Sequence, residues 1–172
     1  MRSLKYFIAL FFISTITFYA QQIPMTVDTA LTNSNNLPSG VVKSTDPWTA
    51  KNVITIEELA KELKSKKDKP VVLQIGFESL YYYARIPGAI YAGPGRSEDG
   101  IKLLKSEAKK LKKNQNIVLY CGCCMWHECP NVRPAFETMK KLGFKNAKVL
   151  YIPDSFNADW MYKDYPVAKG KN

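Results

Sequence analysis

The chain has 172 residues, enough for one domain with a hydrophobic core but too few for two large domains. Hydrophobic residues make up 46% and charged residues 23%, a balance that excludes collagen-like, mucin-like and wholly disordered chains. The formal net charge of +10 favours anionic partners without specifying their kind. The chain has a single His, which excludes a site that needs several imidazoles.

Residues 1–20 are predicted to be a signal peptide. Arg2 and Lys5 precede an uncharged, largely apolar run over 6–20, and Phe18 at the −3 position leaves the cleavage site open. The alternative is an uncleaved membrane anchor, but this run is shorter than the roughly 20 apolar residues that a span requires. We therefore expect an exported protein, periplasmic or extracellular, with no stable membrane anchor after cleavage. Its cysteines would then meet an oxidising compartment.

The remaining chain is predicted to form an arm, one domain and a short tail. Residues 21–51 are rich in Thr, Ser, Asn and Pro and show no sustained hydrophobic period, so we expect a loosely docked N-terminal arm or linker. The domain is expected over 52–168, with a C-terminal tail at 169–172.

Within the domain, the hydrophobic pattern predicts alternating helices and strands. The first helix begins with a capping box, in which Thr55 is followed three positions later by Glu58. Helices are predicted at 56–64, 100–113, 132–142 and 154–163, and short strands at 71–75, 86–92 (after a turn), 117–120 and 147–152. This alternation predicts an α/β fold with a parallel sheet covered on both faces, whose active crevice lies at the carboxyl ends of the strands.

All four cysteines lie between positions 121 and 129, in the segment YCGCCMWHECPN over 120–131. Cys121 directly follows a predicted buried strand, and a helix is expected to begin near Asn131. A thiolate at this place would face the unpaired N–H groups of the helix and of the loop. We expect these groups to lower the pKa of Cys121 below about 8.5 and to make it a nucleophile. The alternative is a buried cysteine that serves only in packing.

Three stretches in order resemble the rhodanese-like family of single-domain sulfurtransferases. They are IPGAI over 86–90, IVLYC over 117–121, and LGFKNAKVL over 142–150 followed by Phe156, Trp160 and YPV over 165–167. The resemblance covers about residues 52–168. It implies a three-layer α/β domain with a central, mostly parallel five-stranded sheet flanked by helices. It also implies that Cys121 takes a sulfane sulfur from a small anionic donor and passes it, as a persulfide, to a thiol acceptor without a cofactor.

The chain departs from the pattern of that family near the expected site. Gln74 and Gly76 stand where the family often has an acidic residue and an Arg, and Arg85 stands where a His is usual. The loop after Cys121 is longer than usual, and the Arg that often closes it is replaced by Arg133, which is already inside the next helix.

Other loop residues are assigned roles with an alternative for each. Cys124 and Cys129 are predicted to be a second or resolving thiol, and simple disulfide pairing is the alternative for both. Substrate binding is predicted for four further residues, which are Gly122, Trp126, His127 and Arg133. The alternatives are packing under the loop for Trp126, a solvated side chain for His127, and a surface position for Arg133. We assign no role to Cys123.

Two other functions compete with sulfur transfer. The cluster Cys121/Cys124/Cys129 would also suit a thiol–disulfide redox or sensor protein. Three or four thiolates would suit Zn(II) or Cu(I), as in a non-catalytic metal-binding module, but their crowding differs from structural zinc spacing, so we predict no metal. The lysines at 105–113 lie on one face of a helix without interleaved aromatics, and we expect no nucleic-acid partner. The sequence does not indicate an oligomeric state.

Overall fold

The structure is a computed structural model that describes residues 37–171. The predicted signal peptide and the first part of the predicted arm lie outside the described residues. Among the residues that are described, no helix is long and apolar enough to cross a membrane.

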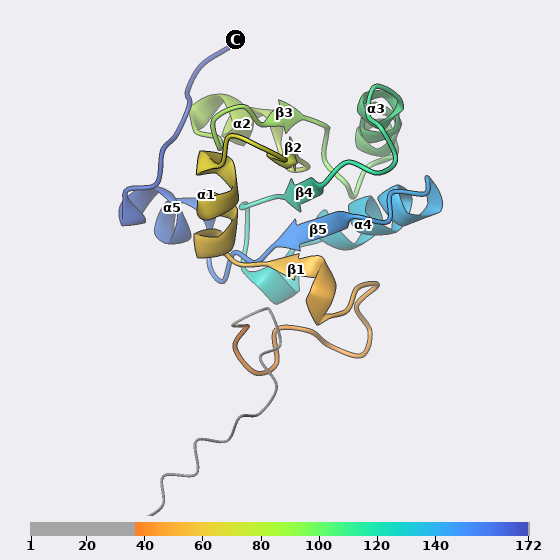
Figure 1. Cartoon of the computed structure of the whole chain (residues 1–172), viewed down its shortest axis with the longest axis horizontal. Helices are drawn as coiled ribbons and strands as arrows, with labels where there is room; N and C mark the ends of the chain where they lie inside the picture. Colours follow the sequence, from red (N-terminus) through yellow and green to blue (C-terminus); the bar gives the residue numbers. More distant parts are fainter. Residues whose placement is uncertain (1–36, 172) are drawn as a thin grey trace, which may run out of the picture. The chain divides into compact units, whose positions relative to one another are not determined.

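The centre of the domain is a five-stranded sheet in the order β1-β5-β4-β2-β3, in which every neighbouring pair is parallel (Figure 1). This confirms the predicted α/β fold. β4 lies in the middle, between β5 and β2, so the residue that follows it emerges at the centre of the carboxyl edge. The strands are β1 (Val53–Ile54), β2 (Val71–Gln74), β3 (Ile90–Tyr91), β4 (Ile117–Tyr120) and β5 (Ala147–Leu150).

Within residues 37–171, five α-helices connect or flank the strands. α1 has the predicted capping box, because Thr55 Oγ1 accepts from the backbone of Glu58 and the Glu58 carboxylate accepts from Thr55 N. The helix predicted at 100–113 instead begins after Ser97, whose hydroxyl accepts from Gly100 N and caps it. The helices are α1 (Ile56–Lys64), α2 (Glu78–Tyr83), α3 (Glu98–Lys109), α4 (Val132–Lys141) and α5 (Phe156–Asp159).

Three short elements complete the described fold, and two elements have no counterpart in the sequence prediction. The 3-10 helices are η1 (Ala50–Asn52), η2 (Trp126–Glu128) and η3 (Met161–Lys163), so the helix predicted at 154–163 is divided into α5 and η3. β1 and α2 were not predicted. β1 has only two residues, and α2 has six residues with three consecutive tyrosines, so neither is long enough for a hydrophobic period to show.

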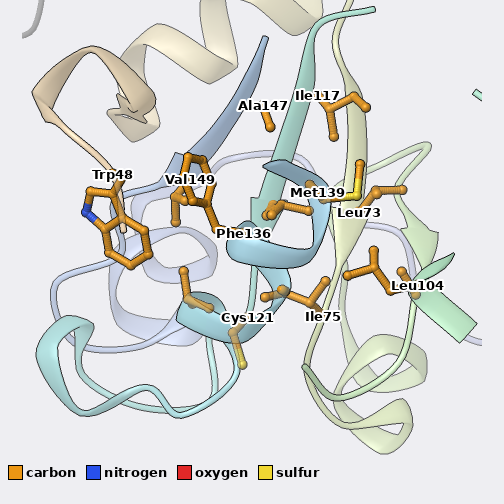
Figure 2. Close-up of a cluster of buried hydrophobic side chains, with 14 of the residues drawn as sticks. Trp48, Leu73, Ile75, Leu104, Ile117, Cys121, Phe136, Met139, Ala147 and Val149 are labelled. Atoms are coloured by element: carbon orange, nitrogen blue, oxygen red, sulfur yellow. The ribbon is translucent and has the colours of Figure 1, made fainter. Parts of the chain in front are cut away.

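Side chains of β4 alternate between two hydrophobic clusters on the two faces of the sheet. Ile117, Leu119 and Cys121 belong to the cluster under α3 and α4, which Figure 2 shows with Cys121 at one end. Val118 and Tyr120 belong to the cluster on the other face, with side chains from α1 and α5. The alternation therefore sets which face of the sheet the sulfur of Cys121 occupies.

The described part of the predicted arm is packed against the domain. Val41 and Trp48 are buried in the cluster that contains Cys121. Trp126 Nε1 donates to the backbone oxygen of Val41 at 2.6 Å, and the Arg133 guanidinium pairs with the buried carboxylate of Asp46 at 2.7 Å. The expectation of a loosely docked arm is wrong for these residues, because two aromatic or aliphatic side chains and one ion pair tie them to the domain.

Candidate active site

Cys121 directly follows β4, at the carboxyl edge of the sheet, where the fold predicts a site. Cys121 is buried, with 4% of its surface exposed to solvent. The neighbouring strand β2 ends at Gln74, and a Cβ added two residues later at Gly76 would lie only 2.9 Å from Cys121 Sγ. The position at which the family often has an Arg therefore leaves room in this protein for the sulfur itself.

The loop after Cys121 is held by backbone contacts with the segment before and within α5. Gly122 adopts a φ of +71°, and a Cβ there would lie 2.6 Å from the Cβ of Phe156, so this position favours glycine for both conformation and space. Phe156 N donates to Gly122 O at 3.1 Å, and Trp126 N donates to Pro153 O at 3.0 Å. The tight turn at Gly122 brings Cys123 back toward Cys121.

Four thiols converge in this loop, and all four cysteines are free. Cys121 Sγ donates to Cys123 Sγ at 3.1 Å, and the sulfurs of Cys123 and Cys124 are 2.9 Å apart. The sulfurs of Cys121, Cys123 and Cys129 all lie within 4.8 Å of one another. The sequence assigns no role to Cys123, but its sulfur contacts the sulfurs of both Cys121 and Cys124. The turn at Gly122 explains the first contact, because it brings the side chains on its two sides together.

Asn131 is a site residue that sequence reasoning missed. It is fully buried, and its Nδ2 donates to Cys121 Sγ at 3.2 Å and to Cys123 Sγ at 3.7 Å. Its Oδ1 accepts from Arg96 N at 3.1 Å, which fixes the orientation of the amide with its N–H groups toward the sulfurs. An Asn before a helix is usually read as an N-cap, but this side chain makes no cap hydrogen bond to α4.

The four thiols share their protons, and the lowest pKa belongs to Cys123. Hydrogen bonds from Cys121 and Cys129 stabilise an anion there and lower the pKa of Cys123 below its ordinary value. The same contact with Cys123 raises the pKa of Cys121 above its ordinary value, although Cys129 and the backbone amide of Cys123 act in the opposite direction. Burial raises the pKa of Cys124, and the hydrogen bond with Cys121 raises that of Cys129.

The contact with Cys123, rather than the surrounding amides, is the largest influence on the Cys121 thiol, and it opposes the ionisation that the sequence predicts there. Cys123 is more exposed to solvent than Cys121 or Cys129. Cys121 Sγ donates to Cys123 Sγ at 3.1 Å, so Cys123 is placed to accept its proton. This arrangement pairs a nucleophile with a base, which is a recognised way to activate a thiol.

A cavity of about 160 Å³ opens in front of Cys121. Its lining residues come from the ends of β2 and β4 and from α2 and α5, namely Gln74, Leu80, Tyr83, Ala84, Tyr120, Cys121, Gly122, Cys123, Ser155, Phe156 and Asn157. Gln74 is buried, and in the described part of the chain its Oε1 has no hydrogen-bond partner. A cavity of this size suits a ligand of a few atoms rather than a drug-sized molecule, which needs roughly 300 Å³ or more.

The predicted substrate-binding residues lie in different surroundings. Gly122 lines the cavity with Cys121. Trp126 is buried and packs on Trp48, with ring centroids 5.5 Å apart, so it serves in packing under the loop. His127 is exposed. Arg133 Nε and Nη2 are both engaged by Asp46, at 2.9 Å and 2.7 Å.

The sulfurs of Cys121, Cys123 and Cys129 could together bind one soft metal ion. Tetrahedral sulfur ligands at about 2.3 Å from a zinc ion lie about 3.8 Å from each other, which is within the 4.8 Å span of this group. The Asn131 amide would then donate a hydrogen bond to one of these ligands, the sulfur of Cys121.

The family was tested by comparison with known proteins. A family model described as the rhodanese-like domain matches residues 55–158. A comparison with curated proteins found no match.

Solved structures show a similar fold. The BH2092 protein from Bacillus halodurans is 24% identical, with a TM-score of 0.53 over 69% of this chain and 77% of that chain. The Alr3790 protein from Anabaena sp. is 18% identical, with a TM-score of 0.54 over 69% and 94%. A variant of EanB in complex with hercynine is 22% identical, with a TM-score of 0.50 over 69% and 27%. Because the family model spans more than half of the sequence, this chain belongs to the rhodanese-like domain family.

Proposed function

We propose that the protein is a sulfurtransferase that carries a sulfane sulfur as a persulfide on Cys121. The observation that supports this most directly is the pairing of two thiols at the cavity. Cys121 ends the central strand, lines the cavity, and donates its proton to Cys123 at 3.1 Å. A nucleophile, a base in contact with it and an adjacent space for a small substrate are the minimum that covalent group transfer requires.

The proposed first half-reaction begins when the proton of Cys121 passes to Cys123. The Cys121 thiolate then attacks the outer sulfur of a small anionic donor such as thiosulfate. The new bond joins Sγ to that sulfur, the sulfur–sulfur bond of the donor breaks, and sulfite leaves with its electron pair. Asn131 Nδ2, which donates to Sγ at 3.2 Å, stabilises the negative charge on the attacking atom.

In the second half-reaction a thiol acceptor removes the outer sulfur and regenerates Cys121. The formal charge of +10 over the whole chain favours the approach of an anionic donor from solution. The cavity of about 160 Å³ limits the donor to a small molecule.

Mass spectrometry of thiosulfate-treated protein tests this function. The wild-type chain is expected to release about one equivalent of sulfite and to form a Cys121 species about 32 Da heavier, which carries the added sulfur until a thiol removes it. Cys121→Ser is expected to gain none, whereas Cys124→Ser, a matched exchange of a neighbouring thiol, is expected to react as the wild type does. Sulfur uptake by Cys121→Ser at the wild-type rate would contradict the assignment.

A second candidate function is thiol–disulfide exchange, and the short contacts between free thiols favour it. Sulfurs 3.1 Å and 2.9 Å apart need only a small approach to reach the length of a disulfide, which is about 2.05 Å. Thiol counting in buffers of graded redox potential distinguishes the two candidates. A pair that cycles near the potential of its compartment, without uptake of sulfur from thiosulfate, would support exchange.

We also propose that the chain is exported. The support is the positively charged start and the apolar run over 6–20 of the sequence. N-terminal sequencing of the protein recovered from the periplasm or the medium is expected to begin near Gln21. Recovery of the intact chain from the membrane fraction would instead support an uncleaved anchor.

A further inference from the structure

The proposed function leaves open where the sulfur goes after Cys121 has received it. A second sulfur atom is already in contact with the first. Cys123 Sγ lies 3.1 Å from Cys121 Sγ, and no protein atom needs to be moved aside for the two to meet, because they already form a hydrogen bond. Any persulfide formed on Cys121 is therefore made beside a thiol that can attack it.

Cys123 also differs from the other two thiols in its access to the cavity. Cys121 and Cys123 both line the cavity in front of β4, whereas Cys124 and Cys129 do not. Cys129 is buried, with 3% of its surface exposed, while Cys123 is only half-buried. Cys123 is thus the one neighbour of Cys121 that both a bound donor and an external thiol can reach.

The backbone between the two cysteines favours a bond between them. Gly122 is the single intervening residue, and its positive φ of +71° turns the chain so that the side chains on either side converge. Asn131 Nδ2 donates to both sulfurs, at 3.2 Å and 3.7 Å, and holds them on the same side of the buried amide.

From these contacts, and on the basis of the proposed function, we propose that Cys123 is a resolving thiol that releases the sulfur of the Cys121 persulfide as hydrosulfide. In this step the proton of the Cys123 thiol passes to the outer sulfur of the Cys121 persulfide anion. The Cys123 sulfur attacks Cys121 Sγ, the bond between Sγ and the outer sulfur breaks, and hydrosulfide leaves with the electron pair. A Cys121–Cys123 disulfide remains.

The disulfide must be reduced before the next turnover, and an external dithiol is the class of reductant that the site fits. One dithiol sulfur attacks the more exposed Cys123 sulfur, and its second thiol then displaces that sulfur and closes a disulfide in the reductant. The sum over one cycle converts thiosulfate and a dithiol into sulfite, hydrosulfide and the oxidised dithiol. Atoms and electrons balance, since the dithiol supplies the two electrons that reduce the sulfane sulfur.

The test is a single turnover with stoichiometric thiosulfate, under anaerobic conditions and without added thiol. The pH is about 9, so that Cys121 can still ionise in the variant that lacks Cys123. Wild-type protein is expected to release about one equivalent of sulfide and to lose about 2 Da, with a disulfide mapped between Cys121 and Cys123. Cys123→Ser is expected to release no sulfide and to keep the persulfide, about 32 Da heavier. Met125→Ser, which changes an exposed residue of the same loop, is the control and is expected to behave as the wild type does.

The outcomes separate this inference from the proposed function. If the wild type retains a stable persulfide on Cys121 and releases no sulfide, the resolving role of Cys123 is wrong and sulfur transfer stands. If neither the wild type nor Cys123→Ser gains or releases sulfur, the proposed function fails as well. If Cys123→Ser does not fold, disulfide mapping on the wild type alone tests the inference. A disulfide between Cys121 and Cys129, in place of one between Cys121 and Cys123, would overturn it.

Discussion

Two cavities of this protein differ in size and in chemistry. The larger, of about 420 Å³, is lined by residues that include Pro70, just before β2, and Trp160, whereas the smaller, of about 160 Å³, is lined by Gln74, the last residue of β2, and Cys121. The two therefore lie toward opposite ends of the same strand. The charged residues that line the larger cavity are Lys64 and Lys69, which are both exposed.

The comparison teaches that size does not identify the site in this fold. The larger cavity is bounded by packing side chains, and its lining residues offer no nucleophile in contact with a base. The smaller one lies at the carboxyl edge of the parallel sheet, where strand ends bring Cys121, Cys123 and Gln74 together. Substitutions at the two cavities should accordingly separate stability from chemistry.

The largest effect is expected at the larger cavity, from Trp160→Ala. Trp160 is 1% exposed, stacks on Phe156 and donates from Nε1 to Pro166 O at 2.8 Å. Its removal is expected to lower the free energy of unfolding by about 3–5 kcal/mol, measured by denaturant titration. Tyr162→Ala, in an exposed neighbour, is expected to change it by less than about 0.5 kcal/mol.

Trp160→Ala also tests the division between the cavities. Under conditions where Trp160→Ala remains folded, it is expected to take up the same amount of sulfur per folded chain as the wild type. A folded variant that no longer accepts sulfur would show that the larger cavity belongs to the site.

The next effect concerns the pH dependence of thiol reactivity at the smaller cavity. The pKa of Cys123 is lowered, so its anion persists as the pH falls through the range in which an ordinary thiol becomes protonated. Below a pKa of about 8.5 a free thiol loses roughly tenfold in thiolate per pH unit. We expect the fastest alkylation rate of the wild type to change less than about threefold between pH 8 and pH 6.

The matching variants give this pH prediction its control. In Cys123→Ser the base is gone, and the fastest rate is expected to fall by roughly 100-fold over the same two pH units. Cys124→Ser keeps the contact between Cys121 and Cys123 and is expected to keep the flat profile. A steep profile in the wild type would mean that the resting cluster carries no thiolate.

The elements that the sequence predicts well are those with a local physical signal. The capping box at Thr55 and the apolar run that forms β4 each determine their own structure, and both agree with the sequence prediction. The position of Cys121 at a strand end follows from that run. The parallel sheet follows from the alternation of strands with helices.

The parts that could not be predicted depend on contacts between distant segments. Asp46 and Arg133 are 87 positions apart in the sequence, and no local pattern reveals that they pair. The role of Cys123 depends on the turn at Gly122, which brings its sulfur to 3.1 Å from the sulfur of Cys121. The spacing of the cysteines in the sequence does not indicate this contact. The rise in the pKa of Cys121 has the same origin, because its largest cause is the contact with Cys123, which no local sequence pattern reveals.

A smaller effect on the reaction is expected from Gly76→Ala. The new methyl group would lie 2.9 Å from Cys121 Sγ and 2.9 Å from Gln74 Nε2, so at least one of the two side chains must move. Displacing the attacking sulfur by a fraction of an ångström is expected to slow sulfur uptake by about 10–100-fold. Stopped-flow measurement of sulfite release checks this rate. An unchanged rate would show that the sulfur leaves this position before it reacts.

The smallest effect is expected from Gln74→Leu, which tests the polar wall of the smaller cavity. Gln74 Oε1 is buried, and among the described residues it has no hydrogen-bond partner. A buried acceptor without a partner costs about 1–3 kcal/mol, and Leu removes that acceptor. We therefore expect Gln74→Leu to raise the free energy of unfolding by about 1 kcal/mol, since the branched shape of Leu fits the space of the linear Gln side chain less well and offsets part of the gain. Denaturant titration of the unliganded protein measures this change.

The same variant shows whether Gln74 Oε1 takes part in the reaction. If Gln74 Oε1 accepts a hydrogen bond from a bound substrate, Gln74→Leu is expected to be more stable than the wild type and slower in sulfur uptake, because the destabilising acceptor is then needed for the substrate. A gain in stability with an unchanged uptake rate would instead assign Gln74 to the wall of the cavity alone. A loss of stability above about 1 kcal/mol would contradict the premise, since it would mean that the acceptor already has a partner in the folded protein.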